Sequence, residues 1–152
     1  MEILNNLIND STSSWIDALP TYQKNKINEL LEKGYSTTEV AELWLSASPK
    51  NIAPFGTEKG NNIFLEKIKE EFEGLLCGDS KYDSYRSKLS NEVTLSKGYV
   101  IGFISSAIAP FVGTSGTFIA PIVALLLVGM GKVTLNAWCK CCKEKKSQIL
   151  YN

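Results

Sequence analysis

The chain of 152 residues contains no histidine. This absence removes the side chain that most often acts as a general base near neutral pH, and it excludes metal sites built on imidazole. The N-terminal stretch MEILNNLINDST has neither a basic start nor a long apolar run, so we expect no secretory signal. The acidic residues form no evident paired site. We therefore expect no enzyme, no cofactor and no metal ion.

Charge is also absent from residues 98–131, which lie between Lys97 and Lys132. A membrane-spanning helix needs about 20 apolar residues, and this stretch is too long for one straight span. Its centre, Gly113-Thr114-Ser115-Gly116, is typical of a turn. The sequence therefore predicts a transmembrane helical hairpin that turns at residues 113–116.

Lys97 and Lys132 are symmetric about that turn, so a reversal of the chain places both on one side of a membrane. Each uncharged arm reaches only about 22 Å, which is short of the hydrocarbon core of about 30 Å. We therefore expect the spans to extend to about 93–113 and 117–138, with both lysines reaching towards the interface. The positive-inside rule then predicts a multi-pass membrane protein with the preceding head and the C-terminus in the cytoplasm.

The net charge of zero conceals two halves of opposite sign. Residues 1–96 contain ten Lys/Arg and fifteen Asp/Glu, whereas residues 97–152 contain six Lys and one Glu. A basic segment beside an apolar hairpin favours a membrane surface, and so a lipid bilayer, as a partner. The acidic first half argues against a nucleic-acid partner.

The first half shows helical spacing of apolar residues and no useful strand pattern. Ser36 and Glu39 fit a capping box at the start of one helix, and Gly34 is a natural end for the helix before it. The expected helices are 3–9, 13–19, one from Pro20, one after Ser36, 62–76, and a last one from Asp79 that continues straight into the hairpin. We expect an all-α protein with a cytosolic helical domain (1–92), a hairpin (93–139) and a basic tail (140–152).

The stretch Gly34–Ala41 resembles the opening of a helix-turn-helix, but Pro54 would then lie inside the recognition helix. An ordinary capped helix is the better interpretation. The cysteines, in turn, are expected to be reduced cytosolic thiols. Cys139, Cys141 and Cys142 are candidate lipidation sites because they lie among lysines just outside the expected span. A zinc site is disfavoured, because only the distant Cys77 is left as a fourth ligand.

Small residues recur along both arms of the hairpin at a spacing that lets membrane helices approach closely. They pack either within one hairpin or between copies in a homo-oligomer, and the sequence leaves both open. The candidate packing residues are Gly98, Gly102, Ser106, Ala109, Gly113, Gly116, Ala120 and Ala124. The candidate pore-lining residues are Ser105, Thr117, Thr134 and Asn136. The candidate anionic-ligand residues are Lys81, Arg86 and Lys88.

Several stretches resemble the membrane effector of Hailong-type anti-phage defence systems in bacteria. They are Trp44-Leu45, Pro54-Phe55-Gly56, Leu76-Cys77-Gly78-Asp79 and Asn136-Ala137-Trp138-Cys139. The resemblance implies an oligomeric channel of the bacterial inner membrane that disrupts this membrane during infection. It also implies a nucleotidyltransferase partner protein and a head held inactive by a nucleotide-derived or oligonucleotide regulator.

Our functional expectation is a membrane effector that oligomerises into a pore or ion channel gated through its helical head. The alternative is a membrane-anchored adaptor or regulatory subunit that recruits a protein partner. In a further alternative the hairpin is hidden inside a soluble helical bundle until it is triggered, as in some pore-forming toxins. Only about 95 residues are available to cover it, so full concealment without oligomerisation is difficult.

Overall fold

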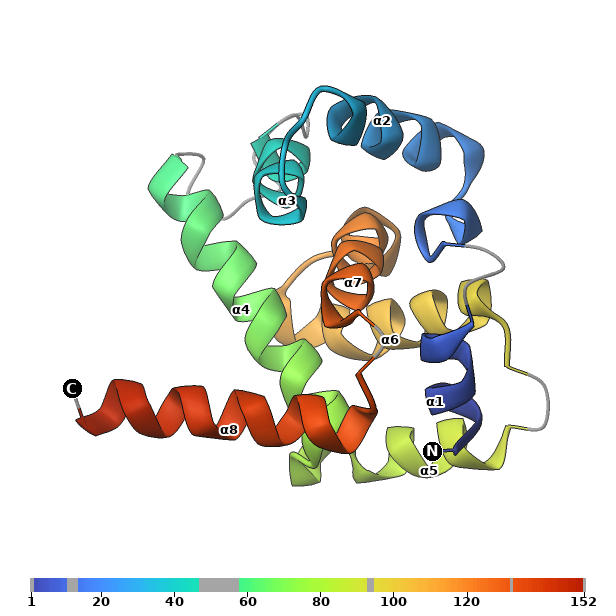
Figure 1. The fold of residues 1–152 in the computed structure, drawn as a ribbon, viewed down its shortest axis with the longest axis vertical. Helices are drawn as coiled ribbons and strands as arrows, with labels where there is room; N and C mark the ends of the chain where they lie inside the picture. Colours follow the sequence, from blue (N-terminus) through green and yellow to red (C-terminus); the bar gives the residue numbers. More distant parts are fainter. Residues whose placement is uncertain (1, 11–13, 47–57, 93–94, 132, 152) are drawn as a thin grey trace.

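The computed structural model describes residues 2–10, 14–46, 58–92, 95–131 and 133–151, and within these ranges every regular element is helical (Figure 1). The expected all-α fold is confirmed. The elements are α1 (Glu2–Asn9), η1 (Ile16–Ala18), α2 (Thr21–Glu32), α3 (Thr37–Ser46), α4 (Glu58–Cys77), η2 (Ser80–Tyr82), α5 (Asp83–Asn91), α6 (Lys97–Val112), α7 (Gly116–Met130) and α8 (Leu135–Tyr151).

The helices of the first half begin and end largely where their local signals lie. The capping box at α3 is confirmed, because Glu39 N donates to Ser36 Oγ at 3.2 Å and Ser36 N donates to Glu39 Oε1 at 3.1 Å. Gly34 follows α2 with a φ of 94°, in the left-handed region that glycine adopts without strain. Pro54, which counted against a helix-turn-helix, lies outside the described residues.

The predicted continuous helix from Asp79 into the apolar stretch is wrong. The chain forms the short turn η2 and then α5, which ends at Asn91, and Glu92 adopts an extended conformation with a ψ of 128°. Ser96 then caps a new helix by accepting a hydrogen bond from Tyr99 N at 3.1 Å. The head therefore meets the apolar stretch through a break and not through a continuous rod.

The apolar stretch forms two helices, α6 and α7, which we call the α6–α7 pair. Gly113 follows α6 with a φ of 83°, and Ser115 caps α7 by accepting from Phe118 N at 3.2 Å. The pair bends by 116° at this break, well short of the 180° of an antiparallel hairpin. The expected extension to 93–113 and 117–138 is wrong, because α6 begins at Lys97 and α7 ends at Met130.

The α6–α7 pair lies inside the bundle. Figure 1 shows α7 near the middle of the molecule, with α3 and α4 on one side of it and α6 packed against it. The side chains of Ile104, Ile108 and Ile122 are completely buried and belong to the same hydrophobic core as Ile68 of α4. The most apolar part of the chain is thus the core of the fold.

No described helix is by itself long and apolar enough to cross a membrane. Taken together, α6 and α7 have the length and composition of a broken span. The same composition suits the core of a helical bundle. The contacts between the pair and the helices around it therefore bear most directly on function.

Candidate functional site: the contacts that hold the apolar helix pair

Two side chains of the first half bind the beginning of α7. Gln23 of α2 donates from Nε2 to Thr117 O at 2.9 Å, and Trp44 of α3 donates from Nε1 to Phe118 O at 2.9 Å. The Trp44 ring also stacks on Phe118, with ring centroids 6.4 Å apart. Side chains of α2 and α3 thus bind backbone carbonyls of α7, a helix that is distant from both in the sequence.

Pro121 explains why the carbonyl of Thr117 is available to the head. In an α-helix this carbonyl accepts from the N–H four residues later, which is position 121, and proline has no N–H. Gln23 is 93% buried and supplies the missing donor. The Gln23–Thr117 bond therefore satisfies a backbone group that α7 cannot satisfy by itself.

The beginning of α6 and the region after α7 are tied to the N-terminal part of the chain. Lys97 is only 7% exposed; its Nζ donates to Asp10 O at 2.8 Å and lies 5.4 Å from the centroid of the Trp15 ring. Asn5 Oδ1 accepts from Leu135 N at 2.9 Å. The predicted outward reach of Lys97 is thus not seen in this form, because the head satisfies its ammonium group. Lys132 lies outside the described residues.

The candidate packing residues divide into an inner and an outer group. Gly116 lies against the backbone of α6, because a Cβ built on it would be 3.3 Å from backbone atoms of Ser105 and Ser106. On the outer face of α6, Gly98, Gly102 and Ser106 are exposed, and Gly102 has open space where a Cβ would lie. Of the others, Ala109 and Ala124 are buried, Ala120 is half-buried and Gly113 occupies the turn.

The candidate pore-lining residues do not converge in this form. Ser105 is 2% exposed and its Oγ has no hydrogen-bond partner, whereas Thr117 is exposed at the beginning of α7. Thr134 and Asn136 are exposed at the beginning of α8, where Thr134 Oγ1 accepts from Ala137 N at 3.3 Å. The buried hydroxyl of Ser105 is the notable member of this group, since an unpartnered polar group in a core opposes folding.

The candidate anionic-ligand residues are engaged elsewhere and do not form one pocket. Lys81 Nζ lies 2.7 Å from Glu71 Oε1 and 4.3 Å from the centroid of the Phe111 ring. Arg86 donates to the carbonyls of Gly74 and Leu75, and so satisfies the end of α4. Lys88, the third candidate, is exposed on α5 and lines an aromatic groove beside α6.

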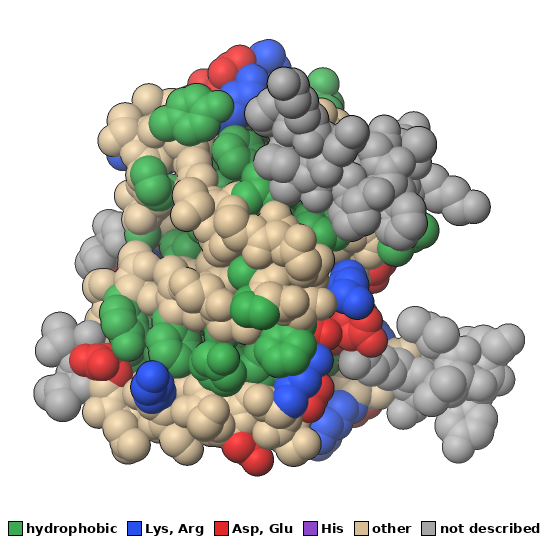
Figure 2. Space-filling view, turned by 180° about the vertical axis from the view of Figure 1, so that it is seen from behind, with side chains coloured by type: hydrophobic (Ala, Val, Ile, Leu, Met, Phe, Trp, Pro, Cys, Tyr) green, Lys and Arg blue, Asp and Glu red, His purple; other side chains and the backbone are tan. Residues whose placement is uncertain are grey.

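Five aromatic side chains of η2, α5 and α6 contact one another edge to face or stacked; they are Tyr82, Tyr85, Tyr99, Phe103 and Phe111. On the back face of the molecule, Figure 2 shows a row of hydrophobic side chains across the lower half. The Tyr82 hydroxyl donates to Glu71 Oε1 at 2.6 Å. Burial, together with this carboxylate, raises the pKa of Tyr82 well above its ordinary value of 10.0. The hydrogen bond to Glu71 likewise raises the pKa of Lys81.

The expectation that all four cysteines are free thiols is wrong for two of them. Cys77 at the end of α4 and Cys139 in the first turns of α8 form a disulfide, with their Cα atoms 5.5 Å apart. The fold brings them together because α4 packs against α8, where the Phe72 and Trp138 rings meet edge to face with their centroids 5.7 Å apart. Cys139 is therefore not available for lipidation in this form, while Cys141 and Cys142 are free.

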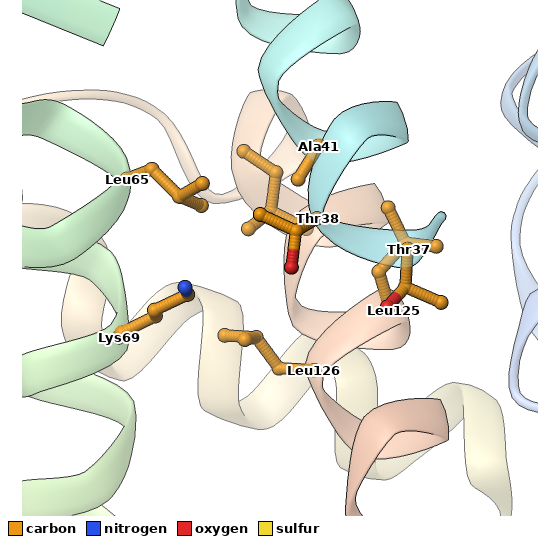
Figure 3. Close-up of a pocket in the computed structure, with 8 residues that line it drawn as sticks. Thr37, Thr38, Ala41, Leu65, Lys69, Leu125 and Leu126 are labelled. Atoms are coloured by element: carbon orange, nitrogen blue, oxygen red, sulfur yellow. The ribbon is translucent and has the colours of Figure 1, made fainter. Parts of the chain in front are cut away.

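A small cavity lies where α3, α4 and α7 meet, lined by residues that include Thr38, Lys69 and Leu125 (Figure 3). Its volume of about 20 Å³ leaves room for roughly one water molecule. With the disulfide closed, the described part of the chain has no group of three His, Cys, Asp or Glu side chains that could hold a metal ion.

Comparison of the chain with known protein families, with curated proteins and with solved structures gives no match. The function of the protein is therefore inferred from the contacts described above.

Sequence reasoning missed the residues that hold α7, which are Gln23 and Trp44. The acceptor was predictable, since Pro121 in an apolar helix leaves the carbonyl of Thr117 without its usual donor. The donor was not predictable, because nothing in the sequence around Gln23 distinguishes it from a surface glutamine on an amphipathic helix.

Proposed function

We propose that the protein is a membrane effector whose α6–α7 pair is held inside the helical head and inserts into a bilayer on release. Copies then oligomerise into a pore or ion channel that disrupts membrane integrity. The observation that carries this proposal is the position of the longest uncharged segment of the chain: it has the composition of a broken span, and here it is the core of a bundle. This arrangement resembles the alternative in which the hairpin is hidden inside a helical bundle until it is triggered.

The way in which the pair is held supports a release step. The two hydrogen bonds to the beginning of α7 come from side chains, Gln23 and Trp44, so they can break without unfolding either α2 or α3. The buried Ser105 Oγ and Gln23 Oε1 have no hydrogen-bond partner. Each such group opposes the closed form by about 1–3 kcal/mol. A closed form with these penalties is easier to open.

The outer face of α6 supports packing between copies after insertion. Gly98, Gly102 and Ser106 follow one another at intervals of four residues and are exposed in the closed form. Small residues at this spacing let two membrane helices approach closely, and close packing is a main source of their association. A homo-oligomer is therefore part of the proposal.

The biological setting follows from the resemblance to Hailong-type effectors. In that setting the protein acts in the bacterial inner membrane during phage infection, and a nucleotide-derived or oligonucleotide ligand of the head keeps the pair in place. A partner nucleotidyltransferase would make that ligand. The head residues Lys81 and Arg86 are engaged within the protein, so such a ligand would bind elsewhere on it.

The proposal is tested by inducing the protein in bacteria and recording membrane potential with a voltage-sensitive dye. We expect the wild type to dissipate the potential and Gly102→Leu to preserve it, because a large side chain blocks close packing on the outer face of α6. Gly129→Leu on α7 is the matched control, because Gly129 also has open space around it and lies outside the small-residue face. It should dissipate the potential as the wild type does.

An intact potential at full expression of the wild type would contradict the effector proposal. If the protein were then found as a membrane-bound monomer in detergent, the adaptor alternative would be favoured. A defined oligomer that depolarises cells supports the channel.

A further inference from the structure

Three cysteines and four carboxylates line one open groove between α4 and α8, and four of these seven side chains lie at helical spacings that bring them together in pairs. Glu73 and Cys77 lie four residues apart on α4, and Cys139 and Cys142 lie three residues apart on α8. Residues at these spacings share one face of a helix, so each helix presents two ligands to the other. One ligand of each helix already contacts the other helix, because Cys77 and Cys139 are bonded to each other.

The third sulfur, that of Cys142, lines the same groove. Cys142 is half-buried and hydrogen-bonds to Glu73, and burial together with that carboxylate raises the pKa of its thiol. Cys141, the neighbouring residue, is exposed and does not line the groove. The sequence alone disfavoured a metal site because Cys77 is distant along the chain, and the fold removes that objection.

We propose that Cys77, Cys139, Cys142 and Glu73 bind a thiophilic divalent cation, with Zn²⁺ as the physiological candidate, when the Cys77–Cys139 disulfide is reduced. A bonded sulfur carries no thiolate charge, so the cation would bind only after the disulfide is reduced. Reduction by a dithiol transfers two electrons and two protons to the pair and leaves the reductant as its own disulfide. Zn²⁺ then displaces one proton from each of the three thiols.

The ligand set suits this cation. Zn²⁺ prefers four tetrahedral ligands, and sulfur and carboxylate oxygen are among those that it takes in proteins. Three thiolates and one carboxylate around a divalent cation carry a net charge of −2. Lys81 and Lys143 line the same groove and reduce the repulsion of that charge. The site would replace one covalent link between α4 and α8 by a metal link at the same position.

The test uses the full chain, reduced and desalted without oxygen, and titrated with Co²⁺ as a spectroscopic probe and with Zn²⁺ in competition. We expect one Co²⁺ per chain, with a tetrahedral spectrum and thiolate charge-transfer bands, and no such bands in the oxidised protein. Cys142→Ser keeps the disulfide pair, so it should fold; its affinity should fall at least about 100-fold, since even the loss of an outer-shell partner costs 10–100-fold.

Cys141→Ser is the matched control, because it removes an adjacent thiol that does not line the groove, and it should bind as the wild type does. Glu73→Gln should weaken binding while leaving the three-thiolate charge-transfer bands in place. The proposal is overturned if reduced wild type binds no Co²⁺, if Cys141→Ser and Cys142→Ser lose affinity equally, or if the oxidised protein binds as tightly. None of these outcomes depends on whether the protein acts on membranes.

Discussion

The hydrogen bond from Gln23 to Thr117 O offers the sharpest test of how the head holds α7. Gln23→Leu keeps a side chain of similar size but removes the donor, and Pro121 prevents α7 from supplying another one. Thr117 O then loses its donor at a part-buried position, and the loss of one such hydrogen bond costs about 0.5–1.5 kcal/mol. The Gln23 Oε1 atom, itself unpartnered, is removed by the same change and offsets part of this cost.

A double-mutant cycle separates these two effects. Pro121→Ala restores a backbone N–H four residues after Thr117, so the carbonyl gains a partner within its own helix. In that background Gln23→Leu should be less destabilising than in the wild type. The offset from Oε1 and any repacking around position 121 occur in both backgrounds and cancel. We expect a coupling energy of about 0.5–1.5 kcal/mol.

The assay is urea denaturation of the four proteins with the disulfide intact, followed by circular dichroism and by tryptophan fluorescence. The two probes must agree for the free energies of unfolding to be compared. If Gln23→Leu destabilised both backgrounds equally, Gln23 would contribute only packing, and the explanation based on Pro121 would be refuted.

Three further predictions concern stability. Gly116→Ala should lower the free energy of unfolding by about 1–3 kcal/mol in urea denaturation, because the new Cβ meets α6 backbone at 3.3 Å. Gly102→Ala, in open space, should raise it by about 0.5–1 kcal/mol. Equal effects of the two substitutions would contradict this packing. Because folding raises the pKa of Tyr82, the contribution of this residue to stability is present below pH 10.0 and is lost above it. The free energy of unfolding should therefore fall between about pH 8 and 11, and Tyr82→Phe should diminish this fall. An unchanged fall would contradict the burial of Tyr82. Reduction of the Cys77–Cys139 disulfide in the presence of a chelator should lower the free energy of unfolding by about 4 kcal/mol for a sequence separation of 62 residues, and no loss would mean that the helices hold together without it.

Local chemistry made several features predictable from the sequence. The capping box of Ser36 and Glu39 and the glycine after α2 depend on residues only a few positions apart. The break before α6 was missed, although Ser96 is a good N-cap residue directly before the helix that it caps. The segment before Ser96 contains neither proline nor glycine, so the N-cap serine is the only local sign of the break.

The position of the α6–α7 pair could not be predicted in the same way. Membrane spans and the cores of helical bundles both require uncharged, apolar side chains, so composition does not separate them. The bend of 116° and the burial of Ile122 depend on contacts with α3 and α4. The disulfide between Cys77 and Cys139 likewise depends on how α4 crosses α8, which no local pattern records.

The most direct test of the central claim, that the head holds the pair until it enters a bilayer, is dye release from vesicles. Purified full-length wild type, Gln23→Leu and Gln23→Leu/Pro121→Ala are added to phosphatidylglycerol/phosphatidylethanolamine vesicles that contain a self-quenched dye. We expect Gln23→Leu to release dye faster than the wild type and the double variant to be slower than Gln23→Leu. No release by any of the three, or identical rates for all, would contradict the account.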